Sequence, residues 1–464
     1  MGQKISKIKR RKFGVRGRES VIDDRESEIN DRNSNVEDRN PEVEGHNPNV
    51  EGRNPDVEDR NPDIGGRNPE VEGRESEVKD RNPEVEDHDP EVEDRNLDVE
   101  GRKYERLLFV SLGMIALDDI EYPEKSKQSV LGGEGLWATF GARLFKPRRL
   151  SKEVGCLVVS RRDYPYPDEL YETLVSWDVT AVAHECYNRP VNRTHVKYGN
   201  QRYFWRTLSY HEPPFKPMVG SLRGTVLFTA ASFHLSCGFA EVRRQIRSIN
   251  GLRLRYGIRE SALIVWQPAY VKAASRDPED PEEMGFEEYL KSYLEVLPQV
   301  DVFSLSYQEL KDIVGGLGTP MPSDDWDARK NVEELSERIP QASLGYQGNG
   351  LMIVRCEPIG YFYRIRNEKG WVKGYSQYYI LESIVDFTGA GSAFLGAFTI
   401  AFLVSGNVED SCKHGAVAAS FAMEQFGLPV MTQRHPLLEE NPYDGEHWNS
   451  ERAFQRLRLL RGDR

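Results

Sequence analysis

A seven-residue repeat that carries a proline and a single apolar residue dominates the first part of the chain. It runs over residues 18–101, which is twelve units, and includes RNPDVED at residues 53–59 and RNPEVED at residues 81–87. A coiled coil with this period needs two apolar positions per unit, whereas most of these units have one valine. The prolines also remove amide donors and clash with a preceding helical turn. We therefore expect residues 18–101 to be a disordered, acidic spacer, with a linear interaction array as the alternative.

The charged residues divide the chain at the end of this repeat. The 464 residues carry a formal net charge of −13, with 62 basic and 75 acidic side chains. Residues 1–101 hold 18 of the basic and 29 of the acidic residues, so the rest of the chain is close to neutral. That part shows no basic excess of the kind that nucleic-acid binding requires, and we expect no nucleic-acid partner.

The chain begins with a short basic segment that fits a lipidation pattern. Residues 1–6 read MGQKIS, which matches the MGxxxS pattern for N-myristoylation at Gly2, and five lysines or arginines follow before residue 13. One myristoyl chain binds membranes only marginally, so the basic cluster would supply the second signal. We predict peripheral membrane contact through residues 1–17. A solvated basic start and a nuclear-localisation patch are the alternatives.

No segment indicates secretion or a membrane span. The most apolar run, residues 393–404 (AFLGAFTIAFLV), is shorter than the ~18 residues that a spanning helix needs and predicts a buried helix. The basic start is not followed by the apolar core of a signal peptide. The five cysteines are scattered and form no CxxC motif, which favours a reducing compartment over disulfides or a cysteine zinc site. We therefore expect a cytoplasmic protein.

From residue 102 onward, short apolar runs alternate with amphipathic stretches. The runs expected to be strands are residues 104–115, 154–160, 225–230, 262–267, 300–305, 351–355 and 378–384. Helical patterns lie between several of them, as at residues 239–249 and 331–339. This alternation predicts an α/β domain whose mostly parallel central sheet is covered on both faces. The region 164–217, rich in Arg, Tyr and Pro, is where we expect a lid or an insertion at the sheet edge.

The segment TGAG at Thr388–Gly391 stands between a strand-like stretch and the apolar run that predicts a helix. Glycines let the backbone turn its amides inward, and a new helix presents unpaired N–H groups at the positive end of its dipole. The loop is therefore suited to binding an anion such as a transferring phosphoryl group. This interpretation requires an open crevice in front of the loop. The alternative is a Gly-rich helix start without a ligand.

The segment DFTGAGSAF at residues 386–394 resembles the signature DTxGAGDxF of the PfkB (ribokinase-like) family of sugar and nucleoside kinases. Further segments resemble family motifs in the right order: GMIALD (113–118), a Gly-Gly loop with its helix (132–145), VDVFSLSYQEL (300–310) and VAASFAMEQFGLP (417–429). The sequences of these segments are most similar to the fungal "maintenance of killer" (Mak-type) branch of the family. The resemblance implies a ribokinase-like three-layer α/β sandwich over residues 102–464, with ATP and Mg²⁺ as cofactors.

The resemblance also implies a set of site residues. The positions that bind substrate in the family are Asp118, Gly132, Gly133 and Trp137. Those near the nucleotide phosphates are Ser306, Thr388, Gly389 and Gly391, with Glu309 near the metal ion. Gly389, Ala390 and Gly391 would form the anion hole, and Ser392 takes the place of the catalytic base.

Several of these positions depart from the family pattern. The acid that removes the proton from the attacking hydroxyl is replaced by Ser392, which has no accessible basic form near neutral pH. General-base catalysis contributes about 10²–10⁴ in rate, and that contribution is at risk. The signature threonine is Phe387, the asparagine of the NxxE motif is Ser306, and the substrate-loop asparagine is Trp137. The phosphate-binding positions therefore match the family better than the positions that select a sugar and start the chemistry.

Two functions are compatible with this pattern. The first is an ATP-dependent phosphotransferase that acts on an alcohol of the sugar or nucleoside class, with proton removal by Asp386, by a water held at Ser392, or by the phosphate. Phosphoryl transfer tolerates the loss of a base because its transition state is loose and positioning dominates. The second is a pseudokinase that binds nucleotide and acts in regulation or interaction. An acidic scaffold is a remote third, and the family often forms homodimers through a lid sheet.

Overall fold

The computed structural model describes residues 106–161, 165–186, 191–199, 206–211, 214–269, 286–314, 325–356, 359–374, 384–433 and 446–462. The basic segment 1–17 with Gly2, the repeats 18–101 and all but the last residue of the strand expected at 378–384 lie outside the described residues. Among the described residues, no helix is long and apolar enough to cross a membrane.

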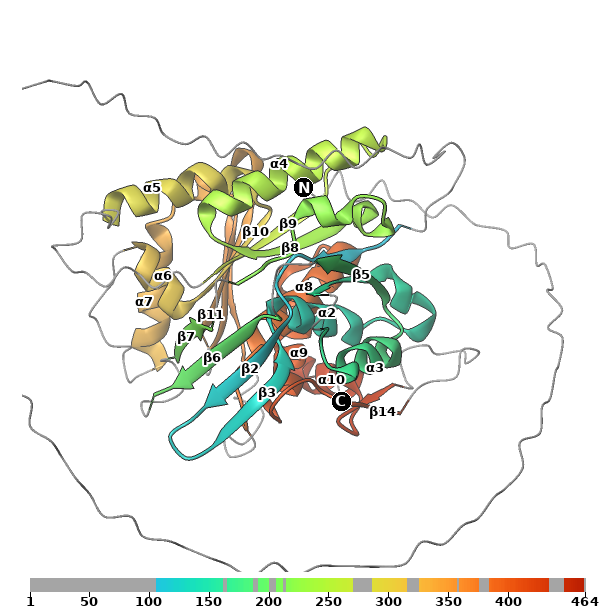
Figure 1. Cartoon of the computed structure of the whole chain (residues 1–464). Coiled ribbons are helices and arrows are strands. Elements are labelled where there is room, and N and C mark those ends of the chain that lie inside the picture. Colours follow the sequence, from blue (N-terminus) through green and yellow to red (C-terminus); the bar gives the residue numbers. More distant parts are fainter. Residues whose placement is uncertain are drawn as a thin grey trace, which may run out of the picture. The chain divides into compact units, whose positions relative to one another are not determined.

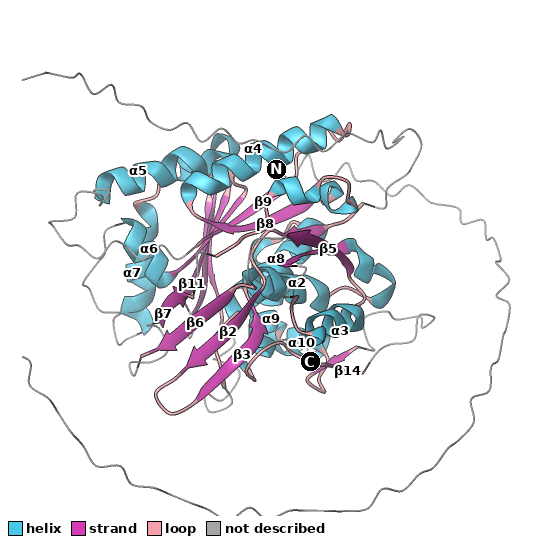
Figure 2. Cartoon of the chain, viewed as in Figure 1, coloured by secondary structure: helices cyan, strands magenta, loops and turns pink. Residues whose placement is uncertain are grey.

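A nine-stranded sheet forms the centre of the described residues (Figures 1 and 2). Its strands, in spatial order, are β13 (Glu368–Val372), β12 (Gly360–Ile365), β11 (Leu351–Cys356), β10 (Val302–Ser306), β9 (Leu263–Pro268), β8 (Ser232–Cys237), β1 (Phe109–Ser111), β4 (Val154–Arg161) and β5 (Thr180–Cys186). The strands from β11 to β5 pair in parallel, and only β12 and β13 are antiparallel. The predicted α/β class with a mostly parallel sheet is confirmed.

Helices cover both faces of this sheet. One face carries α4 (Phe239–Arg255), α5 (Phe286–Val296), α6 (Tyr307–Val314) and α7 (Asp325–Glu337); the other carries α2 (Glu134–Leu144), α8 (Ala390–Ser405) and α9 (Val408–Met423) (Figure 1). Alternate residues of one strand belong to different cores, as Phe109 and Val110 do, because successive strand side chains point to opposite faces. The fold therefore has three layers.

A second, four-stranded sheet projects from the main body (Figure 2). Its order is β3 (Ser126–Gly132), β2 (Ala116–Glu121), β6 (Arg193–Tyr198) and β7 (Arg206–Tyr210). The region 164–217 supplies β6 and β7, as expected of a lid, but it also contains α3 (Asp168–Trp177) and β5 of the main sheet. The other two lid strands come from the segment directly after β1.

Two strand predictions were wrong. The described part of the run 104–115, residues 106–115, contains only the three strand residues of β1, and Asp118 lies on β2 of the second sheet. The run 225–230 contains a 3₁₀ helix at Val226–Thr229, and the strand is the next segment, β8. Both runs are short and apolar, and such runs are buried equally well as strand, turn or helix.

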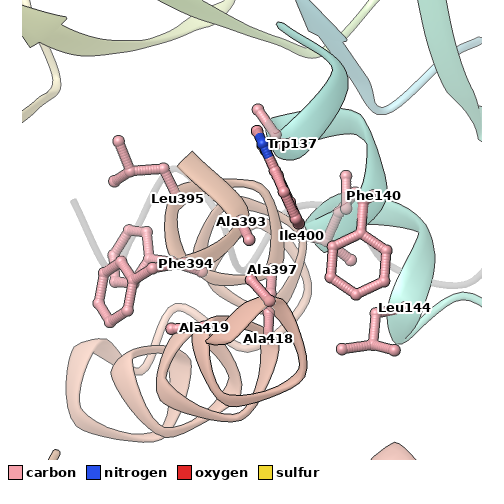
Figure 3. Packing of buried hydrophobic residues seen from close by; sticks show 14 of the residues in the cluster. Trp137, Phe140, Leu144, Ala393, Phe394, Leu395, Ala397, Ile400, Ala418 and Ala419 are labelled. Atoms are coloured by element: carbon pink, nitrogen blue, oxygen red, sulfur yellow. The ribbon is translucent and has the colours of Figure 1, made fainter. Parts of the chain in front are cut away.

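Helices α2 and α8 approach each other without intervening side chains (Figure 3). A methyl group on Gly141 of α2 would lie 1.9 Å from the carbonyl oxygen of Ala393, and one on Gly396 of α8 would lie 1.9 Å from that of Ala138. Only glycine permits so close a contact at these two points. The helix predicted from the apolar run 393–404 is buried, as expected.

The C-terminal segment packs back onto α2 and α9. It contains β15 (His447–Trp448), which pairs with β14 (Met431–Gln433), and α10 (Ala453–Arg461). The Arg143 guanidinium of α2 donates two hydrogen bonds to the Glu446 carboxylate, at 2.8 and 2.6 Å, and both side chains are buried. The Trp448 ring is fully buried against Phe140. This segment therefore completes the core beneath α2.

Candidate functional site

The Gly-rich loop turns into α8 through a glycine in a left-handed conformation. Gly389 has φ 83° and ψ −16° and is the residue that precedes the helix. The Ala390 amide donates to the Phe387 carbonyl at 3.3 Å, and the Ser392 amide donates to that of Gly389 at 3.1 Å. The amides of Gly389 and Gly391 have no hydrogen-bond partner among the described residues. Two of the three amides expected in the anion hole are therefore available.

These amides face a crevice, as the sequence-based interpretation requires. The cavity has a volume of about 70 Å³ and brings together the loop, the start of α2, the lid sheet and the ends of two central strands. Its lining includes Met114, Asp118, Gly133, Glu134, Trp137, Thr194, Val196, Leu208, Gln267, Arg355, Thr388, Gly389, Gly391 and Ser392. Of the predicted site residues, Gly132, Ala390, Ser306 and Glu309 are not part of this lining.

The Trp137 indole fills much of the space in front of the loop. Its side chain is only 2% exposed, and a methyl group on Gly389 would lie 2.1 Å from Trp137 Cε2, so the ring lies directly on the loop backbone. Figure 3 shows this ring between α2 and the start of α8. Typical small-molecule pockets have volumes of about 300–1,000 Å³. With the indole in this position, the volume of the cavity lies well below that range.

Asp118 lies on the lid side of the cavity and is almost fully buried. Its carboxylate accepts a hydrogen bond from the Thr194 hydroxyl and a long one, 3.4 Å, from the Gly133 amide. Burial raises the pKa of Asp118 to about 7, and the nearby Glu134 carboxylate acts in the same direction. A methyl group on Gly132 would lie 2.0 Å from Asp118 Oδ2 and 3.3 Å from Trp137 Nε1, so the carboxylate and the indole are neighbours.

Ser392 is part of a buried hydrogen-bond network. Its hydroxyl donates to Gln267 Oε1 at 3.0 Å, and the same oxygen lies 3.2 Å from His234 Nε2. His234 Nδ1 lies 2.8 Å from Ser111 Oγ, which also accepts the Gly113 amide proton at 3.0 Å. Burial lowers the pKa of His234 to about 4, so the ring is neutral at pH 7.

One proton arrangement satisfies every bond of this network. Gln267 Oε1 accepts from both Ser392 and His234 Nε2, so His234 Nδ1 accepts the Ser111 proton. The Ser392 oxygen can then accept a hydrogen bond from a ligand, but it cannot act as a base. Sequence reasoning assigned no role at the site to Gln267, which lies on β9, or to His234, which lies on β8.

Asp386 does not take over as the base. Its Oδ1 accepts hydrogen bonds from the Tyr122 hydroxyl at 2.9 Å and from the Thr388 amide at 3.0 Å. Burial raises its pKa, but the carboxyl is not among the residues that line the cavity. Its contacts hold the loop in place, and the suggestion that it removes the acceptor proton is not supported by its position.

Comparison with known proteins relates this site to a family. Residues 269–432, which include Arg355 and the whole Gly-rich loop, match the pfkB family carbohydrate kinase. The chain is 25% identical over 369 residues to an uncharacterised protein of Schizosaccharomyces pombe, which covers 75% of this chain and 91% of that protein. It is 21% identical over 334 residues to Protein MAK32 of Saccharomyces cerevisiae, covering 69% and 86% respectively. Over residues 269–432 the chain is therefore similar to the pfkB family.

Solved structures similar to this chain include two ribokinases. The ribokinase of Giardia lamblia superposes with a TM-score of 0.48 at 15% identity, covering 69% of this chain and 94% of that one. A putative ribokinase II of E. coli in complex with ATP and Mg²⁺ gives a TM-score of 0.48 at 14% identity, covering 77% and 100%. The predicted three-layer α/β fold with a mostly parallel central sheet is confirmed by the strand order and by the two cores on either side of the sheet.

The magnesium ion implied by the pfkB family does not fit the residues present. Glu309 Oε2 accepts the Ser306 amide at 2.6 Å, and Ser306 Oγ accepts the Glu309 amide at 3.1 Å, which is a capping box at the start of α6. The same Oε2 lies 3.2 Å from Arg355 Nη2, so a cation already neutralises this carboxylate. Among the described residues, no group of three or more acidic, His or Cys side chains could hold a metal ion. Ser306 and Glu309 thus have structural roles.

Proposed function

We propose that this chain binds the phosphates of ATP at the Gly389–Ser392 loop and transfers the γ-phosphoryl group to a small alcohol. One observation carries the proposal: the unpaired amides of Gly389 and Gly391 open onto the same cavity as the Asp118 carboxylate. The amides are suited to the charge of a phosphoryl group, and the carboxylate is suited to a hydroxyl donor. The acceptor oxygen would bond to the γ-phosphorus as the bond to the ADP oxygen breaks.

The acceptor proton needs a destination other than Ser392. Two carboxylates, Asp118 and Glu134, line the cavity together with the loop, and burial raises the pKa of Asp118 to about 7. A general base works best when its pKa is near the operating pH. We therefore assign proton acceptance to Asp118, in addition to the substrate binding expected from the family resemblance.

A second function is favoured by the crowding of the site. The Trp137 ring covers Gly389, and the loop carries a serine whose proton is held by Gln267. A pseudokinase that binds nucleotide without transferring phosphate would show this combination. Its function would be regulation or interaction with a partner.

An ATP-consumption screen of the full chain separates these functions. Wild type is measured beside Ser392→Asp over a panel of small polyols, sugars and nucleosides, with ATP binding followed by calorimetry. We expect both proteins to bind ATP, and Ser392→Asp to consume it about 10²–10⁴ faster if the base is what limits the rate. ATP binding without turnover in either protein would support the pseudokinase. Absence of ATP binding to the wild type would contradict the proposal.

The remaining expectations are proposals of narrower scope. The similarity to MAK32 supports placing the chain in the fungal Mak-type branch of the family. The domain boundaries at residues 17 and 101, myristoylation at Gly2, membrane contact and cytoplasmic location stay predictions, as does a homodimer. The acceptor class, a small-molecule alcohol, follows from the similarity to the family.

A further inference from the structure

An arginine lies on the Gly-rich loop. Arg355 is on β11, its side chain is 9% exposed, and it lines the cavity in front of the loop. A methyl group on Gly391 would lie 2.1 Å from Arg355 Nη1, so the guanidinium contacts the loop backbone beside the unpaired Gly391 amide. No sequence motif pointed to this residue.

The charge of Arg355 occurs where the family resemblance led us to expect a magnesium ion. Glu309, the expected metal ligand, forms an ion pair with Arg355 at 3.2 Å and holds the start of α6 with the same oxygen. Magnesium needs free oxygen ligands, and a neighbouring guanidinium repels it. Guanidinium groups bind phosphate oxygens strongly by paired, charge-assisted hydrogen bonds.

The Trp137 indole N–H, another donor in the cavity, has no hydrogen-bond partner among the described residues. Its nitrogen, Trp137 Nε1, is buried. A methyl group on Gly389 would lie 2.2 Å from this nitrogen, so the indole N–H is next to the other unpaired amide. A buried donor without an acceptor costs about 1–3 kcal/mol. This part of the cavity thus collects donors that an anionic ligand would satisfy.

From these contacts we propose that Arg355 replaces the divalent cation, so that the loop binds the phosphates of ATP without metal. The guanidinium would neutralise the phosphate charge while the amides of Gly389 and Gly391 and the Trp137 N–H donate to its oxygens. The inference rests on the proposed ATP site and adds to it that magnesium is dispensable for binding.

Calorimetric titration of the full chain with ATP, in EDTA and in excess MgCl₂, tests this inference. We expect the wild type to bind ATP in EDTA with an affinity within about threefold of that in MgCl₂. Arg355→Gln should weaken binding in EDTA roughly tenfold to a hundredfold, with partial recovery in MgCl₂, and Arg355→Lys should keep part of the affinity. Arg366→Gln removes an exposed arginine from the neighbouring hairpin and should leave binding unchanged.

Glu309→Gln is a second variant, and the two explanations predict opposite changes in its affinity for ATP. The amide oxygen can still accept the Ser306 amide proton, so the cap of α6 is kept. If Arg355 is the cation of the site, removing its counter-charge should tighten ATP binding in EDTA severalfold. If Glu309 is a magnesium ligand, the same change should weaken binding in MgCl₂.

The outcomes separate this inference from the proposed function. Binding of ATP by the wild type only in MgCl₂, or an Arg355→Gln variant that binds like the wild type in EDTA, would overturn the metal-free mode and leave the ATP site standing. No binding in either buffer would overturn both.

Discussion

The Asp118 carboxyl is held in a surrounding that favours its protonated form. Burial is the main cause, and the neighbouring Glu134 adds to it, so the pKa of Asp118 rises to about 7. In the unfolded chain the group ionises near pH 4. Between these two values the folded state binds a proton that the unfolded state has lost, so the stability contributed by this group falls as the pH rises.

Replacing this carboxyl should therefore change the pH dependence of stability. We expect Asp118→Asn to raise the free energy of unfolding at about pH 8 by up to ~3 kcal/mol. The effect should be small at about pH 4, where the wild-type group is protonated in the folded state and about half protonated in the unfolded chain. Denaturant unfolding of the full chain at both pH values measures the difference.

Asp119 is the matched control on the same strand. Burial opposes its ionisation, but hydrogen bonds from the Ser129 amide and the Arg193 guanidinium lower its pKa on balance. Asp119→Asn should therefore reduce stability at about pH 8. An Asp118→Asn variant that also loses stability there would contradict the raised pKa.

Single residues of the site differ in how visible they are in the sequence. Thr388 to Ser392 could be predicted because five consecutive residues form the loop, and backbone geometry follows from its glycines. Gln267, His234 and Arg355 could not be predicted, because they come from β9, β8 and β11 and meet only when these strands pair. The sequence shows that Trp137 replaces the asparagine of the family pattern. The contact of its ring with Gly389, however, depends on the packing of α2 against α8.

At the scale of the elements, the contact between α2 and α8 depends on the absence of side chains. Glycine within a helix normally costs about 1 kcal/mol relative to alanine. At Gly396 we expect alanine to be the less stable residue, because an added methyl group would lie 1.9 Å from the Ala138 carbonyl oxygen. The sign of a Gly→Ala substitution therefore reports whether the two backbones touch.

We expect Gly396→Ala to lower the free energy of unfolding by about 2 kcal/mol or more, because the helices must separate. Gly251 in α4 is the control: it is exposed, and a methyl group there meets nothing within 4 Å. Gly251→Ala should stabilise the protein by about 0.5–1 kcal/mol. Thermal or denaturant unfolding measures both, and stabilisation by Gly396→Ala would contradict the close contact.

Four of the nine strands of the main sheet, β4, β9, β10 and β11, could be predicted closely from short apolar runs. The two failures have a common cause. The runs around β1 and before β8 are apolar because they are buried in the core, not because all of their residues are strand. Burial of a segment can be recognised in the sequence by its apolar residues, whereas the pairing that makes a buried segment a strand cannot.

At the scale of the whole described body, a buried ion pair joins segments that are distant in sequence. Arg143 of α2 and Glu446 near the C-terminus are separated by 303 positions and are both nearly inaccessible to solvent. The guanidinium also donates to the carbonyl oxygens of Trp177 and Lys146, each at 2.5 Å. Loss of the carboxylate would leave a buried charge without its counter-ion.

Glu446→Gln should therefore lower the free energy of unfolding by about 3 kcal/mol, as expected when one partner of a buried pair is removed. The control is Glu334→Gln, which breaks an exposed pair with Lys330 and should change stability by less than about 0.5 kcal/mol. Denaturant unfolding compares them. Equal effects of the two substitutions would mean that the Arg143 pair is no stronger than a surface pair.

The close packing of α2 and α8 has a mechanical consequence for the whole body. Gly133 immediately precedes α2 and Gly389 immediately precedes α8. The two glycine turns that border the cavity are therefore attached to two helices that pack directly against each other. A shift of either turn therefore requires a shift of both α2 and α8. The cavity is thus bounded on one side by two helices in backbone contact and on the other by strands β2, β6 and β7 of the smaller sheet.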